Sequence, residues 1–379
     1  MNKVIEVFRH FFMLGWVSFG GPAAHIGYFQ KAFVEKHQWL DNQAYGKLVA
    51  LSQFLPGPGS SQVGFALGLQ RAGLLGGFAA FLGFTLPSFL LMYALAKSQT
   101  FIQGDVLDGI IHGLKLLAVV VVADACLSMY QSFCKNRLTA SIAVASFMLL
   151  VLFSGIGQQM LVLLLAAAIG ALYCQPEQIA QHRTQKVKFV PLILFTVLFL
   201  ATPYLASMSG LQQTFAHFYQ SGALVFGGGH VVLPLLQETA GQTMNNDTFL
   251  MGYAAAQAVP GPMFSLASFL GVHAEPSMPL IGAIVATLAI FLPGFLLILA
   301  LQGAWQSLNS NVKVAGAVVG INAAVVGLLL SALYSPVFVS AVTAPQHMAL
   351  VAGGLLLQRV YKLPIGLMVV GFAIFGLVI

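Results

Sequence analysis

The sequence predicts an all-α, polytopic membrane protein whose two homologous halves have inverted topology and contain broken, re-entrant helical hairpins. Three observations predict it: an apolar composition, long apolar runs, and helix-breaking motifs that recur in both halves. Hydrophobic residues make up 59% and charged residues 7% of the 379 residues, whereas about 25% charged is usual for a soluble domain. The alternation typical of barrel strands is absent, so helices are expected to span the bilayer.

Charge and cysteine usage exclude several other classes of protein. The 16 Lys and Arg residues outnumber the 10 Asp and Glu residues, but they are scattered through loops, so we expect them to set membrane orientation and expect no nucleic-acid partner. Cys126, Cys134 and Cys174 lack metal-ligand spacing and are interpreted as small apolar residues. No metal, cofactor or cleavable signal is predicted.

Nine apolar runs are long enough to predict full membrane spans of roughly 20 residues. They cover residues 73–96, 104–130, 138–153, 156–174, 188–206, 279–302, 311–333, 336–357 and 363–379. The remaining apolar segments are shorter and form pairs, at 4–19 with 23–37, 44–55 with 60–71, 210–226 with 230–241, and 248–259 with 263–273. As helices they reach only about 18–24 Å, less than a ~30 Å hydrocarbon core. We therefore expect two helical hairpins per half that dip into the membrane and meet near its middle.

Three motifs that are expected to break helices inside apolar stretches occur twice along the chain. Phe19-Gly20-Gly21-Pro22 returns as Phe226-Gly227-Gly228-Gly229, Ser52–Pro58 returns as Ala256–Pro262, and Leu86-Pro87-Ser88-Phe89 returns as Leu292-Pro293-Gly294-Phe295, at offsets of 207, 204 and 206. Proline removes a backbone donor and glycine permits positive φ, so each Pro-Gly-Pro must turn the chain. Paired interruptions in two hydrophobic halves are typical of a transporter's binding site.

Charge placement predicts the topology. We expect an N-terminal repeat at 1–175, a linker with an unpaired span at 176–206, and a C-terminal repeat at 207–379. The positive-inside rule places Lys135, Arg137 and the N-terminus in the cytoplasm. The basic loop at 359–362 is the repeat equivalent of the uncharged turn at 154–157, which is then periplasmic. Equivalent loops on opposite sides imply inverted halves, and the unpaired span is the extra crossing that inversion requires.

These motifs resemble the CHR chromate transporter family in its long form with two homologous halves. The resemblance covers nearly the whole chain and rests on Phe19–Phe29, Ser52–Pro58, Phe226–Leu236 and Gln257–Pro262. It implies chromate export across a bacterial inner membrane, with sulfate as the isosteric competitor, and an origin of the halves by gene duplication. The partners it implies are a small oxyanion and the lipid bilayer; the oligomeric state, including a homodimer, stays open.

The breaks also predict where an oxyanion would bind. A helix N-terminus presents unpaired N–H groups and about half a positive charge, which attract an anion without a basic side chain. Four helices restart after such breaks, so four ends could meet around one tetrahedral dianion. The candidate substrate-binding residues at these ends are Gly20, Gly21, Pro56, Gly57, Pro58, Ser60, Ser61, Gly227, Gly228, Pro260, Gly261 and Pro262. The alternative is that these residues only cap helices and allow close crossings.

Four polar side chains near the breaks extend this candidate site. His25 and His230 lie one turn into restarted helices, where each could donate to an oxyanion, relay a proton or simply pack. Gln53 and Gln257 hold the same position in both halves, three residues before each Pro-Gly-Pro. We expect both amides to face the site.

The span 104–130 carries the remaining candidates. Lys115 shares one helix face with Asp108 and His112 and is expected to help hold the anion. Asp124 lies among apolar residues as the expected deepest carboxylate of the chain, and is a candidate for a coupling proton. The alternative for both is an ion pair, internal or between helices, that only orients the helices.

The predicted function is a secondary transporter that exports chromate by alternating access of the two halves. No Gly-rich ATP-binding motif is present, so a gradient or the membrane potential must supply the energy. One alternative is a transporter or passive channel for sulfate or another oxyanion. Another is an intramembrane enzyme acting on lipid phosphates through Ser60 and Ser61, but the motifs of hydrolytic sites are absent, so an enzyme is not predicted.

Overall fold

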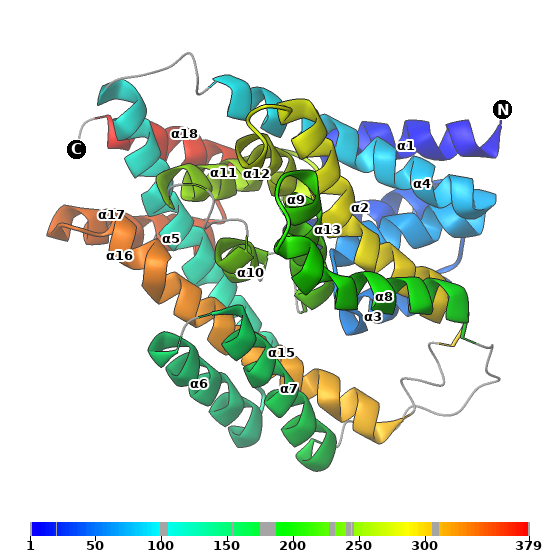
Figure 1. The fold of residues 1–379 in the computed structure, drawn as a ribbon. Helices are drawn as coiled ribbons and strands as arrows, with labels where there is room; N and C mark the ends of the chain where they lie inside the picture. Colours follow the sequence, from blue (N-terminus) through cyan, green and yellow to red (C-terminus); the bar gives the residue numbers. More distant parts are fainter. Residues whose placement is uncertain are drawn as a thin grey trace.

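The computed structural model describes residues 2–19, 21–98, 105–153, 155–174, 187–226, 232–239, 244, 246–304 and 311–377. Within these ranges, helices are joined by short loops and no strand occurs. The all-α prediction is therefore confirmed. The first half contains α1 (Lys3–Val17), α2 (Gly21–Phe29) with its π-helical continuation η1 (Gln30–Lys36), α3 (Asn42–Phe54), α4 (Gly59–Ser98), α5 (Asp105–Phe133), α6 (Arg137–Leu152) and α7 (Ile156–Tyr173). Figure 1 shows their arrangement.

Helix α8 (Phe189–Ala206) separates this half from the second. The second half contains α9 (Leu211–Leu224), α10 (Val232–Thr239), α11 (Asn246–Ala258), the short helix η4 (Met263–Ser265), α12 (Leu266–Ala274), α13 (Pro279–Leu301), α15 (Val312–Ala332), η5 (Leu333–Phe338), α16 (Val339–Ala341), α17 (Pro345–Arg359) and α18 (Ile365–Gly376). Shifted by about 206 residues, the helices of the first half match those of the second in order, and α8 has no equivalent.

Fewer helices than predicted are long enough to span a membrane. Within the described ranges, five qualify by length and composition: Gly59–Ser98, Gly109–Phe133, Phe189–Ala206, Pro279–Leu301 and Val312–Ala341. The predicted spans at 138–153, 156–174 and 363–379 contain shorter apolar helices. The single span predicted at 336–357 is wrong, because helical structure continues from α15 to Ala341 and α17 begins anew with Pro345 in its first turn. Proline is favoured at that position.

The predicted Pro-Gly-Pro breaks fall where helices end, whereas the Leu-Pro-x-Phe motifs do not break a helix, since Pro87 and Pro293 lie inside α4 and α13. Gly57 and Gly261, between α3 and α4 and between α11 and η4, have φ values of +123° and +101°, a region that residues with a Cβ rarely adopt. Helix α4 changes direction at Ala72 and Gly73, between the predicted segments 60–71 and 73–96. The structure therefore has helices at the predicted hairpin segments. How deep these helices lie in a membrane stays a prediction.

The long helices of each half pack on the last helices of the other half. Helix α15 packs against α6 and α7, and α5 packs against α17 and α18. A Cβ on Gly113 of α5 would collide with the carbonyl of Phe372, and one on Gly320 of α15 would collide with the carbonyl of Ala166. These two contacts are repeat equivalents, at offsets of 207 and 206. Small residues that allow backbones to touch are typical of helix crossings in membranes.

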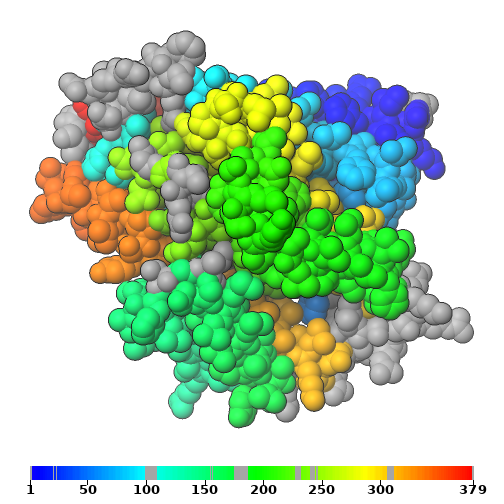
Figure 2. Space-filling model, viewed as in Figure 1, coloured from blue at the N-terminus to red at the C-terminus, as the bar shows by residue number. Residues whose placement is uncertain are grey.

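Helix α8 lies at the periphery of the molecule. Its apolar side chains are mostly exposed, among them Val190, Val197 and Leu200, and only 6% of its span is buried. In Figure 2 it lies at the surface on the right, in green, below the blue N-terminal helices. A helix with a continuous apolar exposed surface is suited to contact lipid.

Candidate functional site

Each Pro-Gly-Pro loop is hydrogen-bonded to the broken hairpin of the opposite half. The Gly57 N–H donates to the Val225 carbonyl at 2.7 Å, and the Gly261 N–H donates to the Ser18 carbonyl at 2.9 Å. Ser18 and Val225 are repeat equivalents, and each directly precedes a Phe-Gly-Gly motif. The two hydrogen bonds are therefore equivalent. In each of them, the loop of one half donates to the broken hairpin of the other half.

The third repeated motif meets the same loops. A Cβ on Gly57 would lie 3.0 Å from Gly294 Cα, and a Cβ on Gly261 would lie 3.0 Å from Ser88 Oγ. Ser88 and Gly294 are the third residues of the two Leu-Pro-x-Phe motifs, in α4 and α13. All three sequence repeats thus converge at the loops, where no room remains for a larger side chain.

His25 connects elements of both halves of the chain near the two Pro-Gly-Pro loops. Its Nε2 lies 3.2 Å from the Ser18 carbonyl, which only accepts, so Nε2 carries the proton and donates. In the neutral imidazole Nδ1 is then an acceptor, and the Ser60 hydroxyl donates to it at 3.2 Å. The side chain is 1% exposed. His25 therefore links the end of α1, the start of α4 and, through the shared Ser18 carbonyl, the Gly261 loop.

Buried hydroxyls without partners lie where the helices restart. Ser61 Oγ and Ser265 Oγ have no hydrogen-bond partner within the described part of the chain, although the residues are only 4% and 1% exposed. They are repeat equivalents at an offset of 204. Ser18 Oγ is also unpaired. Because an unmet buried polar group costs about 1–3 kcal/mol, these hydroxyls are suited to donate to a bound anion.

The other candidates near the loops differ in their surroundings. Gln53 is exposed, whereas Gln257 is half-buried and its Nε2 lies 3.1 Å from Met263 Sδ. A Cβ on Gly21 would meet open space. Four predicted site residues lie outside the described residues: Gly20, Gly227, Gly228 and His230.

Lys115 lies apart from the Pro-Gly-Pro loops. Its ammonium forms a 2.7 Å ion pair with Asp247, at the start of α11. The second loop follows the other end of α11, and the ten residues from Asp247 to Gln257 span about 15 Å of helix. One small anion in this conformation cannot touch both. The contact observed is the ion pair between helices that the sequence left as the alternative, with Asp247 as the partner.

Asp124 is held by the end of α17. It accepts a hydrogen bond from Arg359 Nη1 at 2.8 Å and another from Gln358 Nε2 at 3.3 Å. Its depth in a membrane stays a prediction, but it is not the most buried carboxylate of the described residues. Glu275, which accepts from the Thr214 hydroxyl at 2.8 Å, is buried, whereas Asp124 is partly exposed. The apolar neighbours of Asp124 in sequence face other helices, so they did not indicate its own burial.

Gln62 is a contributor that the sequence did not reveal. Its Nε2 donates to the Pro56 carbonyl at 2.9 Å and to the Gly294 carbonyl at 3.3 Å, so it closes the first loop against α13. The equivalent position in the second half is Leu266. A search for repeated polar residues therefore could not find it.

Comparison with known proteins agrees with these motifs. The family model described as chromate transporter matches residues 5–171 and 212–377. The chain belongs to the chromate transporter family. It is 28% identical to the chromate transport protein of Pseudomonas aeruginosa over 96% of this chain and 89% of that one. It is 27% identical to that of Cupriavidus metallidurans, over 98% and 92%.

Further relatives extend this family assignment. A probable chromate transport protein of Synechococcus elongatus is 29% identical over 86% of this chain and 83% of its own length. No solved structure is significantly similar to the chain. Family membership and the five long apolar helices together establish a multi-pass membrane protein.

Proposed function

We propose that this chain is a secondary transporter that exports chromate, a tetrahedral oxyanion, across the bacterial inner membrane by alternating access of two inverted halves. The family and the names of its relatives support chromate as the substrate. The proposed mechanism rests on two reciprocal backbone hydrogen bonds, from Gly57 to Val225 and from Gly261 to Ser18. Each half thereby contributes one loop and one broken hairpin to the same centre.

The anion would bind where α4 and η4 begin. Backbone N–H groups at these starts and the unpaired hydroxyls of Ser61 and Ser265 supply donors to oxyanion oxygens. Neutral donors bind a dianion without the strong attraction of a buried cation, which favours release after transport. His25, with both ring nitrogens engaged, positions the first helix start.

Several features support an inverted relation of the halves. The contacts of α5 with α17 and α18 repeat those of α15 with α6 and α7, as two-fold related halves require. In Figure 1, α5 begins at the upper left and α15 at the lower right, so their N-termini lie at opposite ends of the molecule. Opposed directions are what inverted repeats produce, and such halves exchange access by rocking around a fixed site.

Counterflow in inverted membrane vesicles tests the proposed function. Vesicles preloaded with unlabelled chromate should accumulate labelled chromate transiently, and unlabelled sulfate outside should compete. A carrier shows this trans-stimulation, whereas flux without it would indicate a channel. Absence of protein-dependent flux for both oxyanions would contradict the proposal.

The unpaired hydroxyls are expected to contact the anion more directly than Ser60 does. Ser61→Ala and Ser265→Ala should each weaken chromate affinity by about 1–3 kcal/mol, the contribution of a hydrogen bond to a charged group. Equilibrium binding to the purified protein measures this. Ser146→Ala is the control, because this buried serine lies on α6, away from both loops. Unchanged affinity in both site variants would leave these hydroxyls without a role in binding.

Cysteine labelling tests the inverted topology. In a background without the three native cysteines, Lys135→Cys should react with a membrane-impermeant maleimide from the cytoplasm, and Ser209→Cys only from the periplasm. The decisive pair is Ser154→Cys and Tyr361→Cys, which are repeat equivalents at an offset of 207; Ser154 lies outside the described residues. We expect them to react from opposite sides. Labelling from one side would make the halves parallel and contradict inversion.

A further inference from the structure

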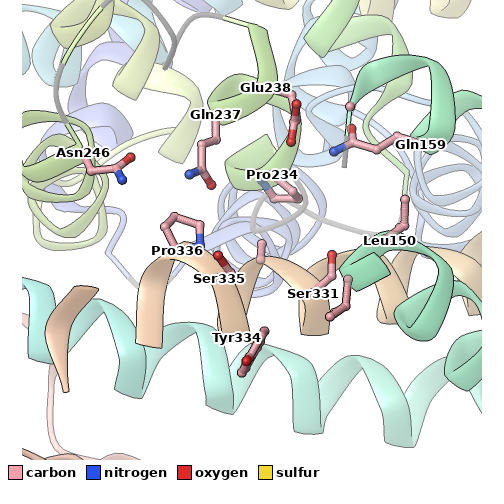
Figure 3. Close-up of a pocket in the computed structure, with 13 residues that line it drawn as sticks. Leu150, Gln159, Pro234, Gln237, Glu238, Asn246, Ser331, Tyr334, Ser335 and Pro336 are labelled. Carbon is pink, nitrogen blue, oxygen red and sulfur yellow. The ribbon is translucent and has the colours of Figure 1, made fainter. Parts of the chain in front are cut away.

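A polar cavity separate from the Pro-Gly-Pro loops lies between the two halves. Its volume is about 440 Å³, and its walls come from α6 and α7 of the first half and from α10, α11, α15 and η5 of the second. Figure 3 shows Glu238, Gln237 and Gln159 along its upper side and Ser331 and Ser335 below them. A space of this size in a membrane protein, lined by amides, hydroxyls and a carboxylate, can hold water and ions.

The cavity holds a carboxylate that no described residue neutralises. Glu238 is half-buried on α10 and forms no ion pair or hydrogen bond within the described ranges. The described lining residues include no Lys, Arg or His, and Tyr334 is the other titratable group among them. An ionisable side chain inside a membrane protein is costly unless it is paired or used. Glu238 therefore has no positive partner among the described residues, and a bound cation or a proton would supply one.

A second, independent group in the same cavity also lacks a partner. Gln159 lines the cavity from α7 and is 6% exposed, yet its Oε1 accepts no hydrogen bond within the described part of the chain. An amide oxygen is an acceptor only. Its unmet acceptor indicates a donor or a cation in the cavity, as the Glu238 carboxylate does.

We propose that Glu238 and Gln159 form the binding site of the coupling ion, a small monovalent cation that is either a proton or Na⁺. Carboxylate, amide and hydroxyl oxygens are the ligands that hard cations prefer. A negative carboxylate without a neighbouring cation disfavours the oxyanion itself, so the cavity is distinct from the substrate site. Because its walls belong to both halves, rocking of the halves changes its access and its shape. This coupling role rests on the proposed transporter function.

Chemical labelling tests cation binding without relying on transport. A hydrophobic carbodiimide reacts with protonated carboxyl groups in apolar surroundings, and mass spectrometry of the purified full-length protein locates the adduct. We expect modification at Glu238. A fall in modification on addition of Na⁺ at fixed pH identifies Na⁺, whereas modification that depends on pH and not on Na⁺ identifies a proton. Lack of modification at Glu238 at every pH and Na⁺ concentration would overturn the proposal.

Transport in proteoliposomes tests coupling. Glu238→Gln should lower chromate accumulation driven by an imposed pH or Na⁺ gradient by about tenfold or more, a typical size for coupling between two sites, while chromate counterflow persists. Gln159→Leu should weaken the same response in part. Glu35→Gln, which removes an exposed carboxylate on η1, should change neither measurement.

The outcomes separate this inference from the proposed function. If Glu238→Gln keeps full gradient-driven accumulation, or if it loses counterflow as well, Glu238 is not the coupling site. If the unmodified protein shows no chromate flux, the transporter function fails, and the carbodiimide labelling still decides whether the cavity binds a cation. Size-exclusion profiles that match the unmodified protein confirm that each variant is folded.

Discussion

Gly57→Ala and Gly261→Ala should each abolish chromate transport while the protein remains inserted in the membrane. Both residues have positive φ, in a region that costs a residue with a Cβ about 1–3 kcal/mol. The added Cβ would also press on Gly294 Cα at 3.0 Å in the first loop and on Ser88 Oγ at 3.0 Å in the second. Since each loop is hydrogen-bonded to the opposite half, displacement of the loop would misplace the helix starts that bind the anion. Counterflow in vesicles, normalised to the amount of inserted protein, measures the effect.

Two other glycines separate the causes of this loss. Gly73 also has positive φ, but a Cβ there meets open space, so Gly73→Ala tests backbone strain alone. Gly46→Ala in α3 adds a methyl group to an ordinary helical position with open space around it and should leave transport unchanged. Transport at the normal rate in both loop variants would move the substrate site away from the Pro-Gly-Pro loops.

The sequence predicted the elements of the fold well because its signals are local. Glycine and proline act through their own backbone geometry, so the helix ends around Pro56-Gly57-Pro58 and Pro260-Gly261-Pro262 fall where predicted. The error at 336–357 has the opposite cause. Its residues are mostly apolar, and an average of hydropathy over the run does not register Thr343, Pro345 and Gln346, around which one helix ends at Ala341 and another begins at Pro345.

The partners of the candidate site could be predicted only in part. The repeats indicated that three motifs belong together, and the structure joins them through Gly57, Gly261 and their cross-half contacts. Residues that occur in one half alone gave no such signal. Gln62 and Glu238 are examples, because their roles depend on neighbours that are distant in sequence. The ion pair also could not be predicted, because Lys115 and Asp247 are 132 residues apart in the sequence.

Asp247→Asn should destabilise the protein, and Lys115→Met should restore most of the loss. The lysine side chain is 10% exposed and the aspartate side chain 54%, so the asparagine variant leaves a buried ammonium without its counter-charge. Removing one partner of a fully buried ion pair costs about 3–5 kcal/mol. Because the Asp247 side chain is more than half exposed, we expect a smaller loss here, of about 1–3 kcal/mol. Lys115→Met alone leaves a carboxylate that water can reach, at a cost of about 0–1 kcal/mol. Thermal unfolding of the two single variants and the double variant in detergent measures these differences.

Transport kinetics on the same variants show whether Lys115 also holds the anion. About 6 Å from a bound anion, at an effective dielectric constant of about 20, one lysine charge would contribute about 3 kcal/mol more to a dianion than to a monoanion. Its loss would then raise the KM for chromate about a hundredfold more than the KM for a monoanion. We expect no such difference, because the ion pair lies at the far end of α11 from the Gly261 loop. A KM that rises selectively for the dianion in Lys115→Met would instead place this lysine at the substrate during the transport cycle.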